Sequence, residues 1–271
     1  MTSPIRTAVV TGGGHGIGRA LCRRLHEDGV TAVVVDIDAA AAKTVASSLD
    51  GHAFALDASA EIAVKDLIEK VEAEIGAIDL FVSNAGVGFG DGEEGAASKG
   101  GGIRSTDDRW DACWRVNVMA HVYAARYLLP RMIARGGGYI ASVASAAGLL
   151  SQIDDAAYSA TKHAAVAFAE SLAITHGEQG INVSVVCPQA VATRMIGIED
   201  DSVSTGGGFG GNDVDGILSA KQVADCIVDG IYEKTFLILP HPQVVNYVQR
   251  KASDRDRWIT GMQRFRRRIG G

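Results

Sequence analysis

The chain has 271 residues, of which 47% are hydrophobic and 21% charged, a composition typical of a folded globular protein rather than a disordered one. Its formal net charge of −6 argues against nucleic acid or anionic membranes as general partners, because binding to phosphates relies on clustered Lys and Arg. The four cysteines lie far apart without a CxxC pair, so neither a metal site nor a disulfide framework is indicated. No apolar run reaches the ~18 residues of a membrane span and the N-terminus lacks a signal-peptide pattern, so we expect a cytoplasmic protein.

Strand and helix patterns alternate from the N-terminus to residue 83. Short apolar runs that stop at a turn residue indicate buried strands, and apolar residues repeating every three or four positions indicate helices. The predicted strands are 5–11, 31–36, 52–56 and 78–83, and the predicted helices run from residue 17 to a stop at Gly29, over 39–49 and over 64–75.

The second half of the chain continues this alternation. A long helix is predicted over 108–135, with Pro130 ending or kinking its last turns. It is followed by a strand over 139–143, a helix over 157–176, a strand over 181–187, a helix over 221–232 and a strand over 235–239. Repeated strand-helix-strand units require parallel strands with right-handed crossovers. We therefore predict an α/β fold of the Rossmann type: a doubly wound parallel sheet of about seven strands with helices on both faces.

The expected domain organisation is one domain over residues 1–249, with a substrate loop near 190–220, followed by a basic tail over 250–271. The loop residues 195–220 form either a closing lid or an unconstrained surface loop, and the glycine-rich segment 88–106 either shapes the same pocket or is disordered. The tail has eight basic residues against two acidic ones. It could contact nucleic acid or be a solvated end, but we favour an interface with an acidic neighbouring surface.

A glycine-rich turn, TGGGHGIG over 11–18, lies between the first predicted strand and helix. Glycines allow a sharp turn and let backbone N–H groups approach a pyrophosphate, which the positive end of the following helix also attracts. The alternative is a strand-helix turn that binds nothing.

Asp36 ends the second predicted strand, where such folds place the adenosine ribose of a dinucleotide. Its carboxylate can accept hydrogen bonds from both ribose hydroxyls and would repel a 2′-phosphate. This favours NAD(H) over NADP(H), although Arg19 could weaken the preference. Alternatively, Asp36 only caps the next helix, a role that Asp38 could fill equally well.

Ser145, Tyr158 and Lys162 form a candidate catalytic group. Tyr158 and Lys162 are four residues apart on a predicted helix and therefore share a face. A neighbouring ammonium favours the ionised phenol, so Lys162 is expected to lower the pKa of Tyr158 from about 10. Taken alone, such a pair is more often a lysine stem packed on a ring.

Together these motifs resemble the short-chain dehydrogenase/reductase family over most of the chain. The turn over 11–18 is similar to the family's TGxxxGxG, Ser83–Asn84–Ala85–Gly86 resembles its NNAG element, and Tyr158 to Lys162 match its YxxxK signature. The resemblance implies a NAD(P)-binding domain in which Tyr158 is the general acid/base. Ser145 would hold the substrate oxygen, and Lys162 would bind the nicotinamide ribose.

The resemblance also implies that Asn117 completes the catalytic tetrad by anchoring a water next to Lys162. Ser145 is favoured over Ser142 because it lies thirteen residues before Tyr158 and begins Ser-Ala-Ala-Gly. One departure from the family is Gln189, which follows Pro188 where a glycine is usual, and which suggests a different loop path or a side chain facing the substrate. The implied cofactor-binding residues are Gly12, Gly14, His15, Gly16, Ile17, Gly18, Asp36, Ile37, Asp57, Asn84, Ala85, Gly86, Tyr158, Lys162, Pro188, Val191 and Thr193.

The function implied is an NAD-dependent oxidoreductase that transfers a hydride between nicotinamide and a small-molecule secondary alcohol or ketone, without a metal. A non-catalytic NAD(H) sensor or scaffold and an acyl-thioester ketoreductase are the alternatives. The resemblance further implies a homotetramer that buries the helices over 108–135 and 157–176.

Overall fold

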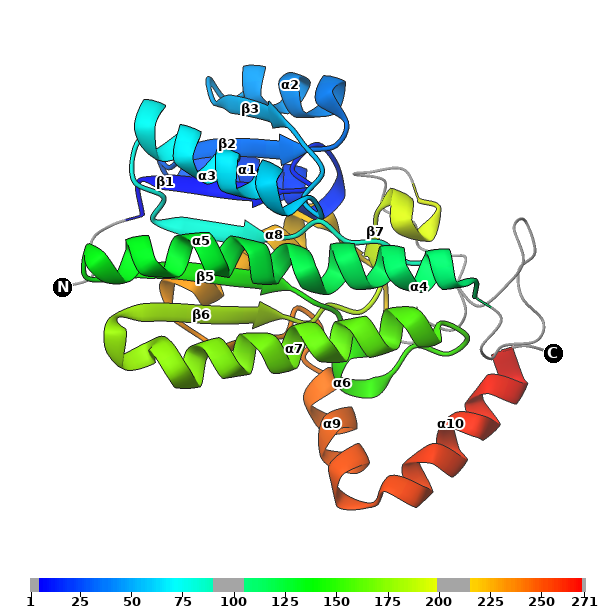
Figure 1. Ribbon diagram of the computed structural model, residues 1–271. Coiled ribbons are helices and arrows are strands. Elements are labelled where there is room, and N and C mark those ends of the chain that lie inside the picture. The colour runs from blue at the N-terminus through cyan, green and yellow to red at the C-terminus, as the bar shows by residue number, and fades with distance from the viewer. Residues whose placement is uncertain (1–4, 90–104, 199–214, 270–271) are drawn as a thin grey trace.

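A computed structural model describes residues 5–89, 105–198 and 215–269 (Figure 1). The main sheet has seven strands in the order β3-β2-β1-β4-β5-β6-β9, and every neighbouring pair is parallel. This confirms the predicted doubly wound α/β fold, because the order runs outward in both directions from β1 and β4. The strands are β1 (Thr7–Thr11), β2 (Thr31–Asp36), β3 (His52–Ala55), β4 (Leu80–Ser83), β5 (Gly138–Val143), β6 (Ile181–Val186) and β9 (Leu237–Ile238).

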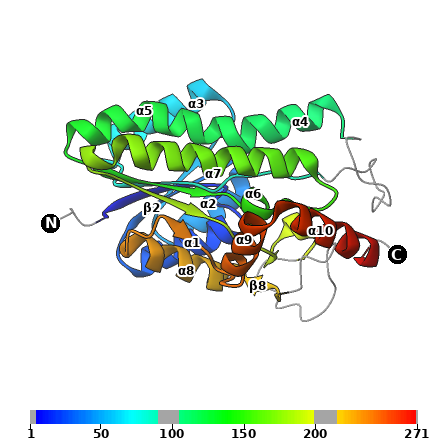
Figure 2. The ribbon, with the colours of Figure 1, turned by 90° about the horizontal axis from the view of Figure 1, so that it is seen from below.

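Helices cover both faces of the sheet (Figure 2). One face carries α1 (Gly16–Glu27), α2 (Ala39–Ser47) and α8 (Ala220–Tyr232). The other carries α3 (Glu61–Glu74), α5 (Ala120–Ala134) and α7 (Ala156–His176). The central strands are buried on both faces, which explains why they are continuous Val, Ile, Leu and Ala runs rather than alternating polar and apolar residues.

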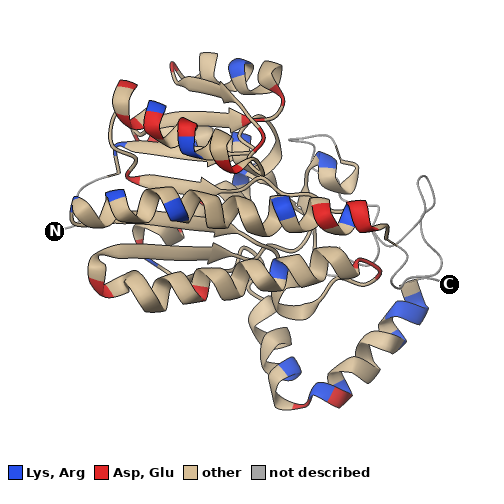
Figure 3. Ribbon diagram, viewed as in Figure 1, with Lys and Arg blue, Asp and Glu red and all other residues tan. Residues whose placement is uncertain are grey.

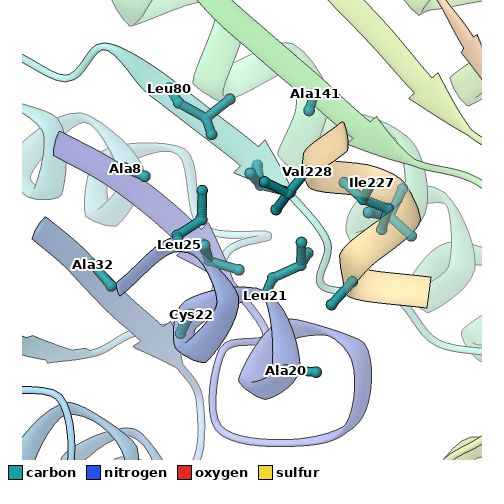
Figure 4. Close-up of a cluster of buried hydrophobic side chains, with 14 of the residues drawn as sticks. Ala8, Ala20, Leu21, Cys22, Leu25, Ala32, Leu80, Ala141, Ile227 and Val228 are labelled. Atoms are coloured by element: carbon teal, nitrogen blue, oxygen red, sulfur yellow. The ribbon is translucent and has the colours of Figure 1, made fainter. Parts of the chain in front are cut away.

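Apolar residues that repeat every four positions in α1 pack into the core between this helix and the sheet. Leu21 and Leu25 are one turn apart and fully buried, and they meet Ile227 of α8 above the sheet residue Leu80 (Figure 4). Because this cluster fixes α1 on the sheet, it also fixes the turn that precedes α1.

The long helix predicted over 108–135 is divided into three parts. α4 (Asp107–Trp114) leads into a π-helical turn, Arg115–Met119, and α5 follows directly. The helix continues for four residues past Pro130, so the proline does not end it. Pro130 and Arg126 lie on the exposed side, where solvent can bond the carbonyl that a proline leaves unpaired.

Short elements that sequence periodicity did not reveal complete the carboxyl edge. They are α6 (Ala147–Leu150) and a small parallel sheet of β7 (Val191–Ala192) and β8 (Leu218–Ser219). Elements of two or four residues are too short to show a period.

The expected basic tail folds as helices. α9 (Val244–Ser253) contains the predicted boundary at residue 250, and α10 (Arg255–Ile269) follows at an angle to it (Figure 1). α10 has six arginines and one aspartate, and Arg266 Nε lies 2.8 Å from Asp154 Oδ1 of the same chain. Figure 3 shows the basic residues along this helix and the acidic residues in the turn before α7. Among the described helices, none is both long and apolar enough to cross a bilayer.

Truncation of Leu21 to Ala should lower the free energy of unfolding by about 2–5 kcal/mol, because it leaves a cavity between α1 and α8. The matched control is Ile259→Ala, since Ile259 on α10 is 48% exposed and its loss should change stability by less than about 0.5 kcal/mol. Urea denaturation measures both. Equal effects of the two substitutions would contradict the packing described.

Candidate active site

The predicted site residues lie around the carboxyl edge of the main sheet. The glycine turn follows β1, Asp36 ends β2, the Asn84 segment follows β4, Ser145 follows β5 and Pro188 follows β6. Because the strands are parallel, their carboxyl ends all lie at one edge of the sheet, which is where ligands bind in open α/β sheets.

The glycine turn is packed so tightly that side chains would not fit. Gly12 and Gly16 have positive φ values of 64° and 48°. A Cβ added to Gly18 would lie 2.1 Å from the Gly12 carbonyl oxygen, and one added to Gly14 would lie 2.9 Å from Asp36 Oδ2. Gly12 and Gly18 therefore permit close backbone contact within the turn, and Gly14 leaves room for the Asp36 carboxylate.

The Asp36 carboxylate is buried and held by backbone donors. The Gly14 N–H donates to Oδ2 and the Asp38 N–H donates to Oδ1, each at 2.9 Å. The capping role is filled by Asp38, whose Oδ1 accepts from the N–H groups of Ala40 and Ala41 at the start of α2. Asp36 is therefore not needed as a helix cap, and its charge remains beside the glycine turn.

Thr11 joins the Asn84 segment to the glycine turn, a role that the sequence motifs did not indicate. Its Oγ1 accepts from the N–H groups of Asn84 at 3.0 Å and Ala85 at 3.1 Å. The Asn84 side chain in turn donates from Nδ2 to the Thr11 carbonyl oxygen at 2.9 Å. These bonds fix the two loops relative to each other.

Tyr158 and Lys162 lie in the first turns of α7. Asp155 caps this helix by accepting from the Tyr158 N–H at 3.0 Å, which sets where the helix begins. The Lys162 ammonium lies 5.5 Å from the centre of the Tyr158 ring and donates to the Val143 carbonyl oxygen at 3.1 Å. The side chain of Lys162 is 2% exposed and has no carboxylate partner among the described residues.

Asn117 lies in the π-helical turn and is fully buried. Its Nδ2 donates to the Val87 carbonyl oxygen at 2.9 Å and to Thr161 Oγ1 at 3.1 Å, and its Oδ1 accepts from the Val87 N–H at 2.9 Å. A Cβ on Gly86 would lie 3.3 Å from both Asn117 Oδ1 and Lys162 Nζ, so these two side chains converge on the backbone of residue 86.

The two candidate serines occupy different environments. Ser145 is partly exposed, its Oγ accepts from the Ala147 N–H at 3.1 Å, and its hydroxyl lies close enough to the Tyr158 phenol to lower the pKa of that phenol. Ser142 is buried and lies 3.1 Å from Nδ1 of His121, whose pKa is lowered to about 3, mainly by burial and secondarily by the Lys162 charge. The structure thus brings Ser145, and not Ser142, to the tyrosine.

The pKa values of the central pair are set by desolvation. Loss of solvent raises the pKa of Tyr158 to about 12, although its bond with Ser145 acts in the opposite direction and Asp155 adds to the rise. Burial lowers the pKa of Lys162 to about 8. The pKa of Tyr158 is therefore raised rather than lowered as expected from Lys162, because ionising a phenol among protein atoms is costly.

The remaining predicted cofactor residues lie toward the ends of the site. Ile37 is exposed beside Asp36, and Asp57 is exposed after β3 with its Oδ1 accepting from the Ser59 N–H. Val191 lies in β7, and Thr193 Oγ1 donates to the Val191 carbonyl oxygen at 3.2 Å. Of the predicted substrate loop, residues 199–214 lie outside the described residues, as do residues 90–104 of the glycine-rich segment.

Gln189 stands where the family usually has glycine. Its φ is not positive, whereas four other non-glycine residues of the described chain do have a positive φ. The backbone at this position therefore does not require glycine. Its N–H donates to Nδ1 of His241 at 3.2 Å, a contact between residues that the sequence did not connect.

Comparison with known proteins identifies the family of the chain. Residues 6–202 match the short chain dehydrogenase family. The chain is 32% identical to a meso-2,3-butanediol dehydrogenase of Serratia marcescens over 70% of this chain and 73% of that protein. It is 31% identical to a cyclohexanol dehydrogenase of an Acinetobacter species, over 70% and 75% of the two chains.

A solved structure supports the same assignment. A short chain dehydrogenase/reductase from Burkholderia phymatum in complex with NAD is 27% identical and superimposes with a TM-score of 0.79, covering 93% of this chain and 94% of that one. Because the family match covers more than half of the residues and the fold and site motifs agree with it, the chain belongs to the short-chain dehydrogenase family of oxidoreductases, which includes dehydrogenases that act on alcohols.

Proposed function

We propose that the protein is an NAD-dependent dehydrogenase/reductase that interconverts a secondary alcohol and a ketone, with Tyr158 as the general acid/base. The observation that carries this proposal is the convergence of Ser145 and Lys162 on Tyr158. Ser145 lies near enough to the phenol to lower its pKa, and the Lys162 ammonium lies 5.5 Å from the centre of the ring. The alcohol substrates named for the two relatives, butanediol and cyclohexanol, support the substrate class.

The residues of the carboxyl edge fit a dinucleotide. The glycine turn has no side-chain bulk at Gly12, Gly14 and Gly18, and it leads into the first turn of a 12-residue helix, where backbone N–H groups and the helix dipole attract phosphate. Gly86 and Gly88 likewise keep backbone next to Lys162 and Tyr158 free of side chains. Bound NAD would supply the hydride acceptor, and its positive nicotinamide ring would favour the ionised phenol.

The side chains around Tyr158 have separate tasks in the proposed reaction. Tyr158 takes the hydroxyl proton of an alcohol, or gives a proton to a ketone oxygen. Ser145 stabilises charge that develops on the same oxygen. Lys162 places a positive charge beside the phenol, and Asn117 holds residues 86–88 and α7 in position through Val87 and Thr161.

Asp36 supports NAD over NADP. Its carboxylate is fixed by two backbone N–H groups at the end of β2, so it cannot easily turn away from a ribose bound there. A 2′-phosphate would bring a second negative charge against this carboxylate, whereas a 2′-hydroxyl could donate to it.

Replacement of Tyr158 by Phe should reduce kcat at least about 100-fold, because it removes the proton-transferring hydroxyl. The measurement is nicotinamide absorbance during turnover of a panel of secondary alcohols and ketones. Tyr232→Phe is the control, since Tyr232 lies on α8 and bonds Asp28 away from the site. Activity that survives in Tyr158→Phe would rule out the proposed role.

Replacement of Asp36 by Asn should lower the ratio of kcat/KM for NAD to that for NADP by about 10-fold or more, because the charge that repels a 2′-phosphate is lost while the side-chain shape is kept. Asp50→Asn, in an exposed turn of positive φ, provides a matched charge control and should leave the ratio unchanged. An unchanged ratio in Asp36→Asn would refute the role of Asp36.

Replacement of Lys162 by Met should abolish turnover yet stabilise the fold at pH 7 by up to about 3 kcal/mol. The Lys162 pKa falls from 10.5 to about 8 on folding, so the unfolded chain holds more protons between these values and wild-type stability rises with pH there. The advantage of the Met variant should therefore be full below pH 8 and nearly gone by about pH 10.5. Thermal unfolding of both proteins across this pH range measures the difference in stability. A Met variant less stable than wild type at pH 7 would contradict the predicted cost of burying the Lys162 charge.

A further inference from the structure

The peptide group between Pro188 and Gln189 lies between Ser145 and a buried histidine. Its carbonyl oxygen accepts from the Ala146 N–H at 2.8 Å and from Ser145 Oγ at 3.5 Å. Its N–H donates to His241 Nδ1 at 3.2 Å. Because a trans peptide is planar with its C=O and N–H pointing in opposite directions, one rigid unit connects the Ser145 hydroxyl to the His241 ring.

His241 extends the pairing of β6 with β9 beyond the ends of both strands. Val185 pairs with Leu237 and Val186 with Ile238, each 52 residues apart, and Gln189 and His241 are separated by the same 52 residues. His241 Nδ1 therefore accepts a hydrogen bond from the Gln189 N–H at a point beyond the last backbone pair of β6 and β9. The side chain is only 2% exposed, so this contact is shielded from water.

Burial favours the neutral form of the His241 ring, and the Gln189 N–H orients it through Nδ1, since Nε2 has no hydrogen-bond partner among the described residues. Burial lowers its pKa, and the nearby carbonyls of Gly216 and Ala190 and the Asp215 carboxylate only partly oppose this. Since Nδ1 accepts from Gln189, the ring proton must be on Nε2. Asp215 is itself held by the Tyr247 hydroxyl of α9 at 2.9 Å, so the C-terminal part of the chain supports the histidine.

We propose that His241 is a positioning residue for Ser145. By holding the Gln189 N–H, it sets the plane of the Pro188–Gln189 peptide, and the carbonyl of this peptide accepts the hydrogen bond of the Ser145 hydroxyl until a substrate oxygen replaces it as the acceptor. The Ser145 Oγ accepts from the Ala147 N–H at the same time, so both bonds fix the hydroxyl where it can turn toward a substrate oxygen. This inference rests on the proposed function for its effect on turnover, but the contact itself does not depend on that function.

The kinetic test compares three variants with wild type. His241→Leu removes the acceptor and should reduce kcat about 10-fold, the equivalent of one misplaced hydrogen bond, while KM for NAD changes less than about twofold. His241→Asn places an acceptor oxygen where Nδ1 lies and should restore most of the rate. In a Ser145→Ala background, His241→Leu should cost less than about twofold, because the two residues act through one peptide.

A loss that is equally large with and without Ser145 would overturn the proposal, as would an Asn variant no better than Leu. Tyr247→Phe provides a milder change at the far end of the contact. If His241→Leu does not fold, Tyr247→Phe takes its place in the cycle with Ser145→Ala.

Hydrogen–deuterium exchange of peptides spanning residues 187–193 tests the contact without cofactor or substrate. Exchange at these amides should be faster in His241→Leu than in wild type and close to wild type in His241→Asn. Equal exchange in all three would overturn the inference even if the enzyme turns over alcohols. Absence of turnover in wild type with either cofactor would refute the proposed function instead, and the exchange result would still decide the inference.

Discussion

The parallel direction of all seven main strands is the constraint on which the rest of the molecule depends. It forces every strand to end at the same edge, so loops that are far apart in sequence meet there. It also requires helices as crossovers, and these bury both faces of the sheet. The glycine turn, Asp36, the Asn84 segment, Ser145 and Pro188 meet because of strand direction rather than because of any attraction among them.

Several buried polar groups at this edge lower the stability of the fold, but their hydrogen bonds fix the position of neighbouring segments. Lys162 keeps an ammonium in the interior with only a carbonyl partner, and His121 is kept neutral by burial behind Ser142. His241 is likewise neutral and buried. Lys162 bonds the Val143 carbonyl oxygen, His121 bonds Ser142 and His241 bonds Gln189, so each group is tied to a segment at the carboxyl edge of the sheet. Such departures from the simplest stable core are expected at functional sites.

Much of this arrangement could be predicted from the sequence, because it is encoded by local periodicity and motif spacing. The doubly wound parallel fold followed from the alternating strand and helix patterns, and Tyr158 and Lys162 share a face because they are four residues apart. What the sequence did not reveal depends on contacts between distant residues. No pattern pairs Gln189 with His241, or Thr11 with Asn84, and the desolvation that raises the pKa of Tyr158 exists only after folding. The helical form of the tail was missed because its arginines were interpreted as a charged end, although Trp258, Met262 and Phe265 recur at helical spacing.

The central claim, that this edge carries out hydride transfer from an alcohol to NAD, is tested most directly by following the hydrogen itself. A secondary alcohol deuterated at its carbinol carbon would be incubated with the wild-type protein and NAD, and the reduced cofactor would be analysed by mass spectrometry. We expect reduced NAD that carries the deuterium, with the ketone as the other product. Ketone formed without deuterium in the cofactor, or no reduction of NAD with any alcohol of a broad panel, would contradict it.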